Sequence, residues 1–141
     1  MAPDDISTRC NAIEECYEFM LAYAGQGLSG KENSQSSGQV RDYLSRAVEA
    51  LSGLPEAYSA AVKLGNLQPA EKFLAFLDVL ERDARDSLAA IQLVLAQTTL
   101  SSQLIDNLNA SIHLRALLTD LFLVDEILKP QQAQARPAIT S

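Results

Sequence analysis

The stretch that decides the fold is LRALLTDLFLVDEIL, which runs from Leu114 to Leu128. Its residues favour a helix, but from Leu117 onward apolar side chains point to nearly every side of that helix. A helix that packs only within its own domain needs a single apolar stripe. This helix therefore has a second apolar surface, and we expect another protein surface to cover it.

The rest of the chain has the composition of an acidic, helical protein. It contains 141 residues, of which 48% are hydrophobic and 6% aromatic, and its formal net charge is −7. The length favours one domain with a buried core. The negative charge argues against nucleic acid and membrane surfaces as partners. Since the acidic N-terminus is unlike a signal peptide and no apolar run could span a bilayer, we expect a cytoplasmic, bacterial protein.

Four segments have apolar residues at steps of three and four, which is the spacing of amphipathic helices. The predicted helices cover residues 5–28, 39–64, 68–96 and 101–129. The polar segment 29–38 is predicted to be a flexible loop, and 130–141 a disordered tail. The pattern therefore predicts an all-α fold, an antiparallel four-helix bundle that forms a single domain over residues 1–129.

The second predicted helix, 39–64, contains a glycine and a proline at Gly53 and Pro55. Proline removes a backbone donor and crowds the preceding turn. We therefore expect this helix to be kinked or broken near Pro55, and we expect Gly65 to end it in the usual position for a C-terminal glycine.

The first and last predicted helices each have more apolar surface than one contact requires. In the last helix, the stripe led by Leu104, Leu108 and Ile112 is predicted to face the bundle core. The remaining apolar faces are predicted to join two copies of the chain, most simply in a twofold dimer. The residues of this predicted interface are Ala12, Cys16, Phe19, Tyr23, Leu114, Leu117, Leu118, Leu121, Val124 and Leu128.

The same core stripe, if it continues, brings Arg115, Thr119 and Glu126 to the core side of the last helix. Buried charge is costly unless it is paired. One interpretation, which we favour, is that the stripe drifts and these residues reach solvent. The other is that Arg115 pairs with a carboxylate and marks a pocket for an anionic ligand. That pocket would be lined by Arg115, Tyr17, Tyr58 and Phe122.

Catalytic and metal-binding constellations are not found in the sequence. The only histidine, His113, has no glutamate three positions before it, which excludes a di-iron centre of the ferritin type. Cys10 and Cys16 project in different directions from one helix and cannot pair with each other. Cys16 is a candidate for a redox-sensitive thiol at the interface. We therefore predict no catalytic residue, no cofactor and no bound metal.

These observations favour a non-enzymatic, self-associating helical protein that acts through protein–protein interaction. Its role would be accessory, regulatory or chaperone-like, and its partners would be a second copy of itself and a larger protein. The alternative is a helical bundle that binds a small molecule in an interior pocket near Arg115. An enzyme or enzyme subunit is a third hypothesis. It ranks below the other two, because no nucleophile or metal-ligand set in the sequence supports it.

Overall fold

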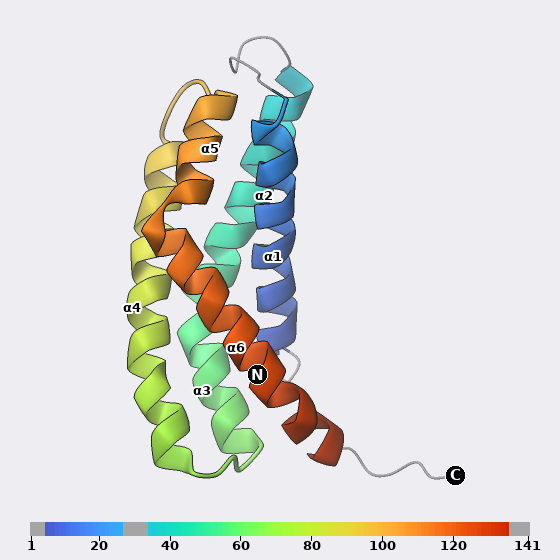
Figure 1. The fold of residues 1–141 in the computed structure, drawn as a ribbon, viewed down its shortest axis with the longest axis vertical. Coiled ribbons are helices and arrows are strands. Elements are labelled where there is room, and N and C mark those ends of the chain that lie inside the picture. Colours follow the sequence, from blue (N-terminus) through green and yellow to red (C-terminus); the bar gives the residue numbers. More distant parts are fainter. Residues whose placement is uncertain (1–4, 27–33, 136–141) are drawn as a thin grey trace, which may run out of the picture.

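The protein is built from helices packed along one another (Figure 1). The computed structural model describes residues 5–26 and 34–135, apart from the side chains of 34–37 and 129–135. Within the described residues the chain forms six helices and no β-strand, which confirms the all-α prediction. The helices are α1 (Asp5–Ala24), α2 (Ser34–Ser52), α3 (Leu54–Leu64), α4 (Ala70–Leu95), α5 (Ser102–Ala110) and α6 (Ile112–Ala135).

Three predicted boundaries are wrong by several residues. Helix α1 ends at Ala24, four residues before the predicted end at 28. Helix α2 begins at Ser34, so the second half of the predicted loop 29–38 is helical. The first half of that predicted loop, 29–33, lies outside the described part of the chain. Helix α6 continues past Pro130 to Ala135, so the predicted tail begins too early. The rest of that tail, 136–141, also lies outside the described residues.

The predicted second helix is two helices, which meet at Gly53. This residue has φ −110° and ψ 6°, and Pro55 lies in the first turn of α3, where a missing backbone N–H costs least. At the end of α3 the left-handed residue is Asn66, with φ 49°, whereas Gly65 keeps φ −81°. Gly65 therefore does not take the left-handed conformation that C-terminal glycines usually supply.

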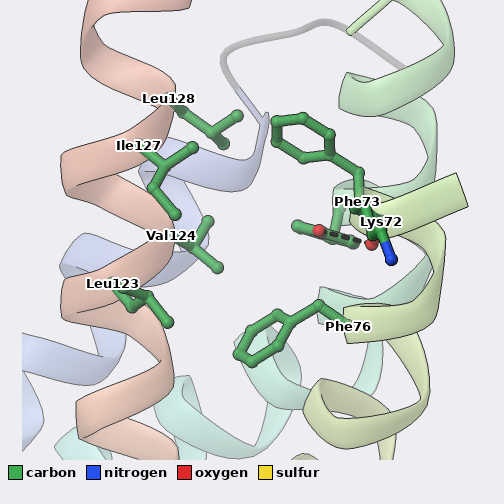
Figure 2. A pocket seen from close by; sticks show the side chains of 8 residues that line it. Lys72, Phe73, Phe76, Leu123, Val124, Ile127 and Leu128 are labelled. Carbon is green, nitrogen blue, oxygen red and sulfur yellow. Dashed lines mark hydrogen bonds between the residues drawn. The ribbon is translucent and has the colours of Figure 1, made fainter. Parts of the chain in front are cut away.

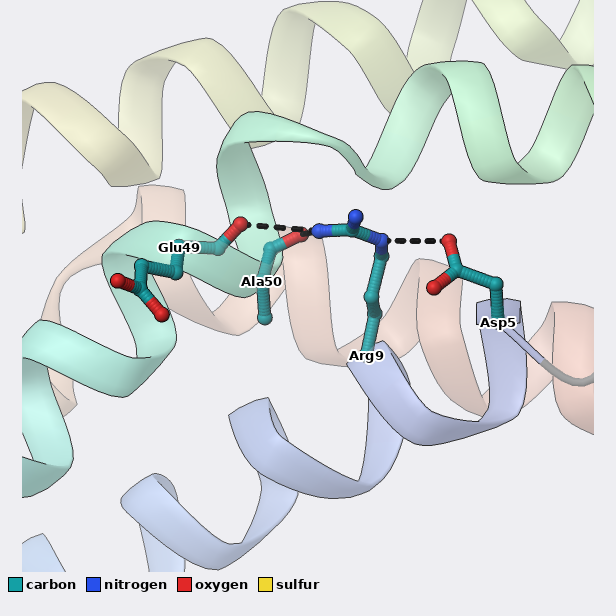
Figure 3. Close-up of polar contacts among 4 residues, drawn as sticks. All are labelled: Asp5, Arg9, Glu49 and Ala50. Atoms are coloured by element: carbon teal, nitrogen blue, oxygen red, sulfur yellow. Dashed lines mark hydrogen bonds and ion pairs between the residues drawn. The ribbon is translucent and has the colours of Figure 1, made fainter. Parts of the chain in front are cut away.

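An arginine of α1 stabilises the junction between α2 and α3 (Figure 3). Arg9 Nη1 donates to the carbonyl oxygens of Glu49 and Ala50, at 2.9 and 3.2 Å. Its Nε donates to Asp5 Oδ2 at 2.8 Å. The last carbonyls of a helix lack partners within the helix, so Arg9 provides the bonds that they miss. A Cβ atom on Gly53 would lie 2.5 Å from Arg9 Cζ, which explains why a glycine fits there.

The predicted fourth helix is also divided, at Ser111. This residue has an extended backbone, with φ −63° and ψ 140°, and separates α5 from α6. Its Oγ accepts a hydrogen bond from the N–H of Leu114 at 3.2 Å, which caps the start of α6. Ser101 caps α5 in the same way, through the N–H of Leu104 at 3.1 Å. No proline or glycine marks the break, and a capping serine is its only signal in the sequence.

Helix α1 contacts four of the other five described helices, which are α2, α3, α5 and α6. At its C-terminal end, Tyr23 donates its hydroxyl proton to the carbonyl of Leu100, and Ser102 Oγ donates to the carbonyl of Tyr23 at 2.9 Å. These bonds fasten α1 to the segment that joins α4 to α5. None of the described helices combines the length and apolarity that a membrane crossing requires.

Candidate functional site

The face predicted to join two copies of the chain lies inside the molecule. Ala12 and Phe19 are partly buried, and the ring of Phe19 stacks on that of Tyr43 in α2, with centroids 4.4 Å apart. The other eight residues are at most 5% exposed. They are Cys16, Tyr23, Leu114, Leu117, Leu118, Leu121, Val124 and Leu128. Since their partners belong to the same chain, these residues do not offer a free surface to a second copy.

In α6, the face predicted for the dimer interface packs into the core, and the face predicted for the core is exposed. The break at Ser111 explains this exchange. Leu108 is buried and Leu104 partly buried, as predicted, but Ile112 is 75% exposed. A new helix begins at Ile112, so the helical phase of α5 does not carry over into α6. The face that packs into the core is therefore the one that contains Leu114 and Leu121.

The predicted pocket around Arg115 is not assembled. Arg115 is exposed, as are Thr119 and Glu126, which agrees with the alternative that this face reaches solvent. Phe122 is 56% exposed, and Tyr17 lies partly buried on α1. Tyr58, one of the four residues predicted to line that pocket, lines a cavity that lies between α4 and α6 and does not include Arg115.

The cavity is a groove of about 280 Å³ between α4 and α6 (Figure 2). On the α4 side the rings of Phe73 and Phe76 point toward α6, and on the α6 side Leu123 and Ile127 point toward α4. All of its lining residues are apolar except Tyr58 and Lys72. The groove is lined by Tyr58, Lys72, Phe73, Phe76, Leu123, Val124, Ile127 and Leu128.

Helix spacing and helix direction together produce this groove. Phe73 and Phe76 lie one turn apart on α4, as Leu123 and Ile127 do on α6, so each pair lies on one side of its helix. Helix α6 starts close to α4 and then crosses the bundle obliquely toward the N-terminus of α1 (Figure 1). The two helices therefore diverge where the groove lies.

The one buried polar group at the groove already has a partner. The hydroxyl of Tyr58 donates to the carbonyl oxygen of Phe73 at 2.6 Å, and burial raises the pKa of Tyr58 to about 12. Its ring also meets that of Phe76 edge-on, with centroids 6.4 Å apart. The groove therefore presents apolar surface, and Lys72 supplies the one charge in its lining.

In and beside the groove, α6 exposes several large apolar side chains. The exposed fractions are 56% for Phe122, 49% for Leu123 and 42% for Ile127. Each Å² of such surface that is removed from water is worth about 25 cal/mol. The sequence indicated an exposed apolar surface on α6, because this helix is apolar on nearly every side. The spacing of the apolar residues could not show which side remains exposed.

Polar contacts join α4 to α6 beyond the groove. Ser87 Oγ donates to the carbonyl of His113 at 2.9 Å, and His113 Nδ1 lies 3.9 Å from Asp86 Oδ2. Nearer the groove, Asp120 is 8% exposed, and its acidic neighbour is Asp83 of α4. Burial, and then the neighbouring Asp83, raise the pKa of Asp120 to about 8. Its Oδ2 atom has no hydrogen-bond partner.

The cysteines are not placed for redox chemistry. Both are free and buried, and burial raises the pKa of each thiol to about 12. Glu14 and Asp125 add to the effect of burial at Cys10. The thiolate is the reactive form, so the proposed redox role of Cys16 has no support. Within the described residues, no group of three or more His, Cys, Asp or Glu side chains could hold a metal ion.

The groove between α4 and α6, together with the exposed face of α6, is therefore the candidate site. The sequence pattern assigned Val124 and Leu128 to the dimer interface and Tyr58 to the ligand pocket, and it assigned the other lining residues to the core or left them unassigned. The chain matches no protein-family model, no curated protein and no solved structure with which it was compared.

Proposed function

We propose that this is a non-enzymatic helical protein that associates with a second copy of itself and acts through protein–protein contact. The contact surface is the groove between α4 and α6 with the exposed residues of α6 beside it. The observation that carries the proposal is that the walls of the groove are almost entirely apolar while Leu123 and Ile127 remain about half exposed. Exposed apolar surface of this kind is typical of an interaction site.

The shape of the surface favours a second copy as the occupant. In a twofold dimer each copy presents the same patch to the other, so a patch that contains a hollow needs a protrusion in the same patch to fill it. Here the groove is the hollow, and Phe122 and Leu123 of α6 are the protrusion. A twofold axis close to α6 would place the α6 side chains of each copy in the groove of the other.

The charges beside the groove are also complementary to each other. Lys72 lies at the α4 wall and Glu126 on the exposed face of α6, and both are exposed. Neither forms an ion pair within the described residues. In a twofold dimer, Lys72 of each copy would face Glu126 of its partner. Such rim charges contribute to register more than to affinity.

The architecture that we propose for this function is an antiparallel bundle of four columns. Helices α2 and α3 together make one column, and α5 and α6 another, beside α1 and α4. The contacts of α1 with α2 and α5, and of α4 with α2, α3 and α6, support this arrangement. Two free, buried thiols also fit the reducing cytoplasm in which we place the protein.

Sedimentation equilibrium over a range of protein concentrations tests the proposal. We expect the wild type to dimerise, and Leu123→Glu to weaken the dimer at least about tenfold, because a charge then enters the apolar contact. Leu93→Glu is the matched control, since Leu93 is 67% exposed and lies near the opposite end of α4. It should leave the dimer unchanged.

A charge exchange tests the orientation of the two copies. Lys72→Glu alone should weaken association, and adding Glu126→Lys in the same chain should restore it, because the two residues meet across the axis. A wild type that stays monomeric at every concentration would overturn the proposal. If that monomer binds dodecanoate stoichiometrically in a Leu123-dependent manner, the small-molecule alternative is correct and its site is the groove.

A further inference from the structure

The side chains of the groove offer little to a polar ligand. Only Tyr58 and Lys72 among the lining residues have polar side chains, and the hydroxyl proton of Tyr58 is already donated to the carbonyl of Phe73. The other lining side chains are hydrocarbon. A polar group placed among them would lose its hydrogen bonds to water and gain none in return. The part of a ligand that lies inside the groove must therefore be hydrocarbon.

The volume of the groove corresponds to a single alkyl chain. It is about 280 Å³, nearly twice the roughly 150 Å³ of an apolar cavity that holds one benzene ring in another protein. By proportion, the groove holds roughly eleven carbon atoms. This space suits one linear chain of that length and is too small for the two longer chains of a membrane lipid.

The lining also contains one cation. Lys72 is exposed, directly precedes Phe73 on α4 and forms no ion pair within the described residues. Glu126, the exposed acid next to Ile127, is not among the lining residues. The whole chain has a net charge of −7, so a lone ammonium group in an apolar groove is a local exception. A carboxylate is the natural partner of such a group.

We propose that the groove binds one free fatty acid, a linear alkyl carboxylate of about ten to twelve carbons, and that this ligand separates the two copies of the dimer. The chain lies along the apolar walls, and the carboxylate pairs with Lys72. In the proposed dimer, apolar α6 side chains and Glu126 of the partner take the same positions, so ligand and partner exclude each other. The effect on the dimer therefore rests on the proposed function.

The two parts of the ligand contribute unequally. Removal of the chain from water supplies most of the affinity, so butanoate, which has the same head and a short chain, should not bind measurably. An exposed ion pair contributes little, so Lys72→Met should weaken the binding of dodecanoate about two- to fivefold. Lys63→Met is the matched control, because Lys63 is exposed on α3 and does not line the groove. It should bind dodecanoate as the wild type does.

Calorimetric titration of the full chain with dodecanoate tests the site. At a protein concentration low enough for the wild type to be monomeric, we expect one molecule bound per chain. Ile127→Glu should abolish this binding, because it places a carboxylate in the apolar wall. Leu93→Glu, an equal change at an exposed residue outside the groove, should keep it. If Ile127→Glu does not fold, Leu123→Glu tests the same wall.

Sedimentation equilibrium with dodecanoate tests the regulation. At a free concentration about tenfold above the dissociation constant of the ligand, the apparent dissociation constant of the dimer should rise about 100-fold, since both separated copies bind ligand. Butanoate at the same concentration should leave the dimer unchanged.

The results distinguish this inference from the proposed function. A dimer that persists in saturating dodecanoate, or that butanoate separates equally well, would overturn the regulation and leave self-association intact. Dodecanoate binding that Ile127→Glu and Leu123→Glu both retain would place the ligand outside the groove and overturn the site. A chain that is monomeric without ligand would overturn the dimer and its regulation together.

Discussion

At the scale of single residues, the junction between α2 and α3 depends on one arginine and one glycine. Arg9 reaches across from α1 to the carbonyls of Glu49 and Ala50, and it occupies the space where a side chain at position 53 would lie. A bond from a charged donor to an otherwise unpaired carbonyl is worth about 1.5 to 3 kcal/mol when it is well sheltered. The junction is therefore a local source of stability.

The first prediction is that the effect of Gly53→Ala changes sign with the residue at position 9. In the wild type it should lower the free energy of unfolding by about 1 kcal/mol, because the new Cβ displaces the guanidinium from its carbonyls. In an Arg9→Met background it should instead raise that free energy by about 0.5 kcal/mol, because alanine restricts the unfolded chain. Urea unfolding of the four proteins measures both effects, and additive effects would contradict the role assigned to Arg9.

At the scale of helices, the contact between α4 and α6 contains a carboxylic acid whose proton binds more tightly in the folded chain. The ordinary pKa of an aspartic acid is 3.8, and in the folded protein that of Asp120 is about 8. The folded state therefore holds a proton that the unfolded state has lost over this range. The stabilising contribution is complete below about pH 4 and is lost as the pH rises through about 8.

The second prediction concerns the pH dependence of stability. Between about pH 5 and about pH 8 the wild type should lose on the order of a few kcal/mol more of its free energy of unfolding than Asp120→Asn does. The asparagine variant should be the more stable of the two at the alkaline end, because its buried amide carries no charge next to Asp83. Urea unfolding at several pH values checks this, and parallel curves for the two proteins would refute it.

The helices also show how far the sequence could predict this fold. The apolar steps of three and four identified every helical region, because burial enforces that period. The same steps were read through Ser111 as one helix, since no proline or glycine interrupts them. The prediction therefore extended the helical phase of Leu108 into α6. As a result, it placed Leu114 and Leu121 at the dimer interface, although they pack into the core. A capping serine is common in sequences, so on its own it is a weak signal for a break.

The candidate site was harder to predict than the fold. Phe73 and Phe76 belong to an ordinary apolar stripe, and Leu123 and Ile127 to a helix that is apolar nearly all round. Whether such residues meet or leave a groove depends on the angle between α4 and α6, which periodicity does not contain. The proximity of Asp83 and Asp120, which are 37 positions apart, depends on the same angle.

At the scale of the whole molecule, the two cysteines report on the integrity of the core. Cys10 and Cys16 are 4% and 2% exposed and lie on the buried side of α1, which packs against α2, α3, α5 and α6. A reagent can reach them only when α1 separates from those neighbours. The pKa of about 12 also leaves very little thiolate at neutral pH.

The third prediction is therefore that both thiols react slowly and together. Ellman's reagent should modify the native protein at least about 100-fold more slowly than the same protein unfolded in urea, because the reaction must wait for the core to open. Cys10→Ser and Cys16→Ser variants resolve the two sites. Rapid modification of one thiol in the native chain would show that α1 is less enclosed than described.

The position of α1 also has a consequence for how the protein is made. The ribosome completes this helix first, yet Tyr23 is bonded to a carbonyl 77 residues further along the chain. At about 5 to 20 residues per second, α1 waits roughly 4 to 15 seconds for that partner to be synthesised. During this time its apolar faces have only α2 and α3 to cover them. Chains that stop before α5 would therefore expose the surface around Cys16 and Tyr23, so premature termination should yield aggregates and no smaller folded protein.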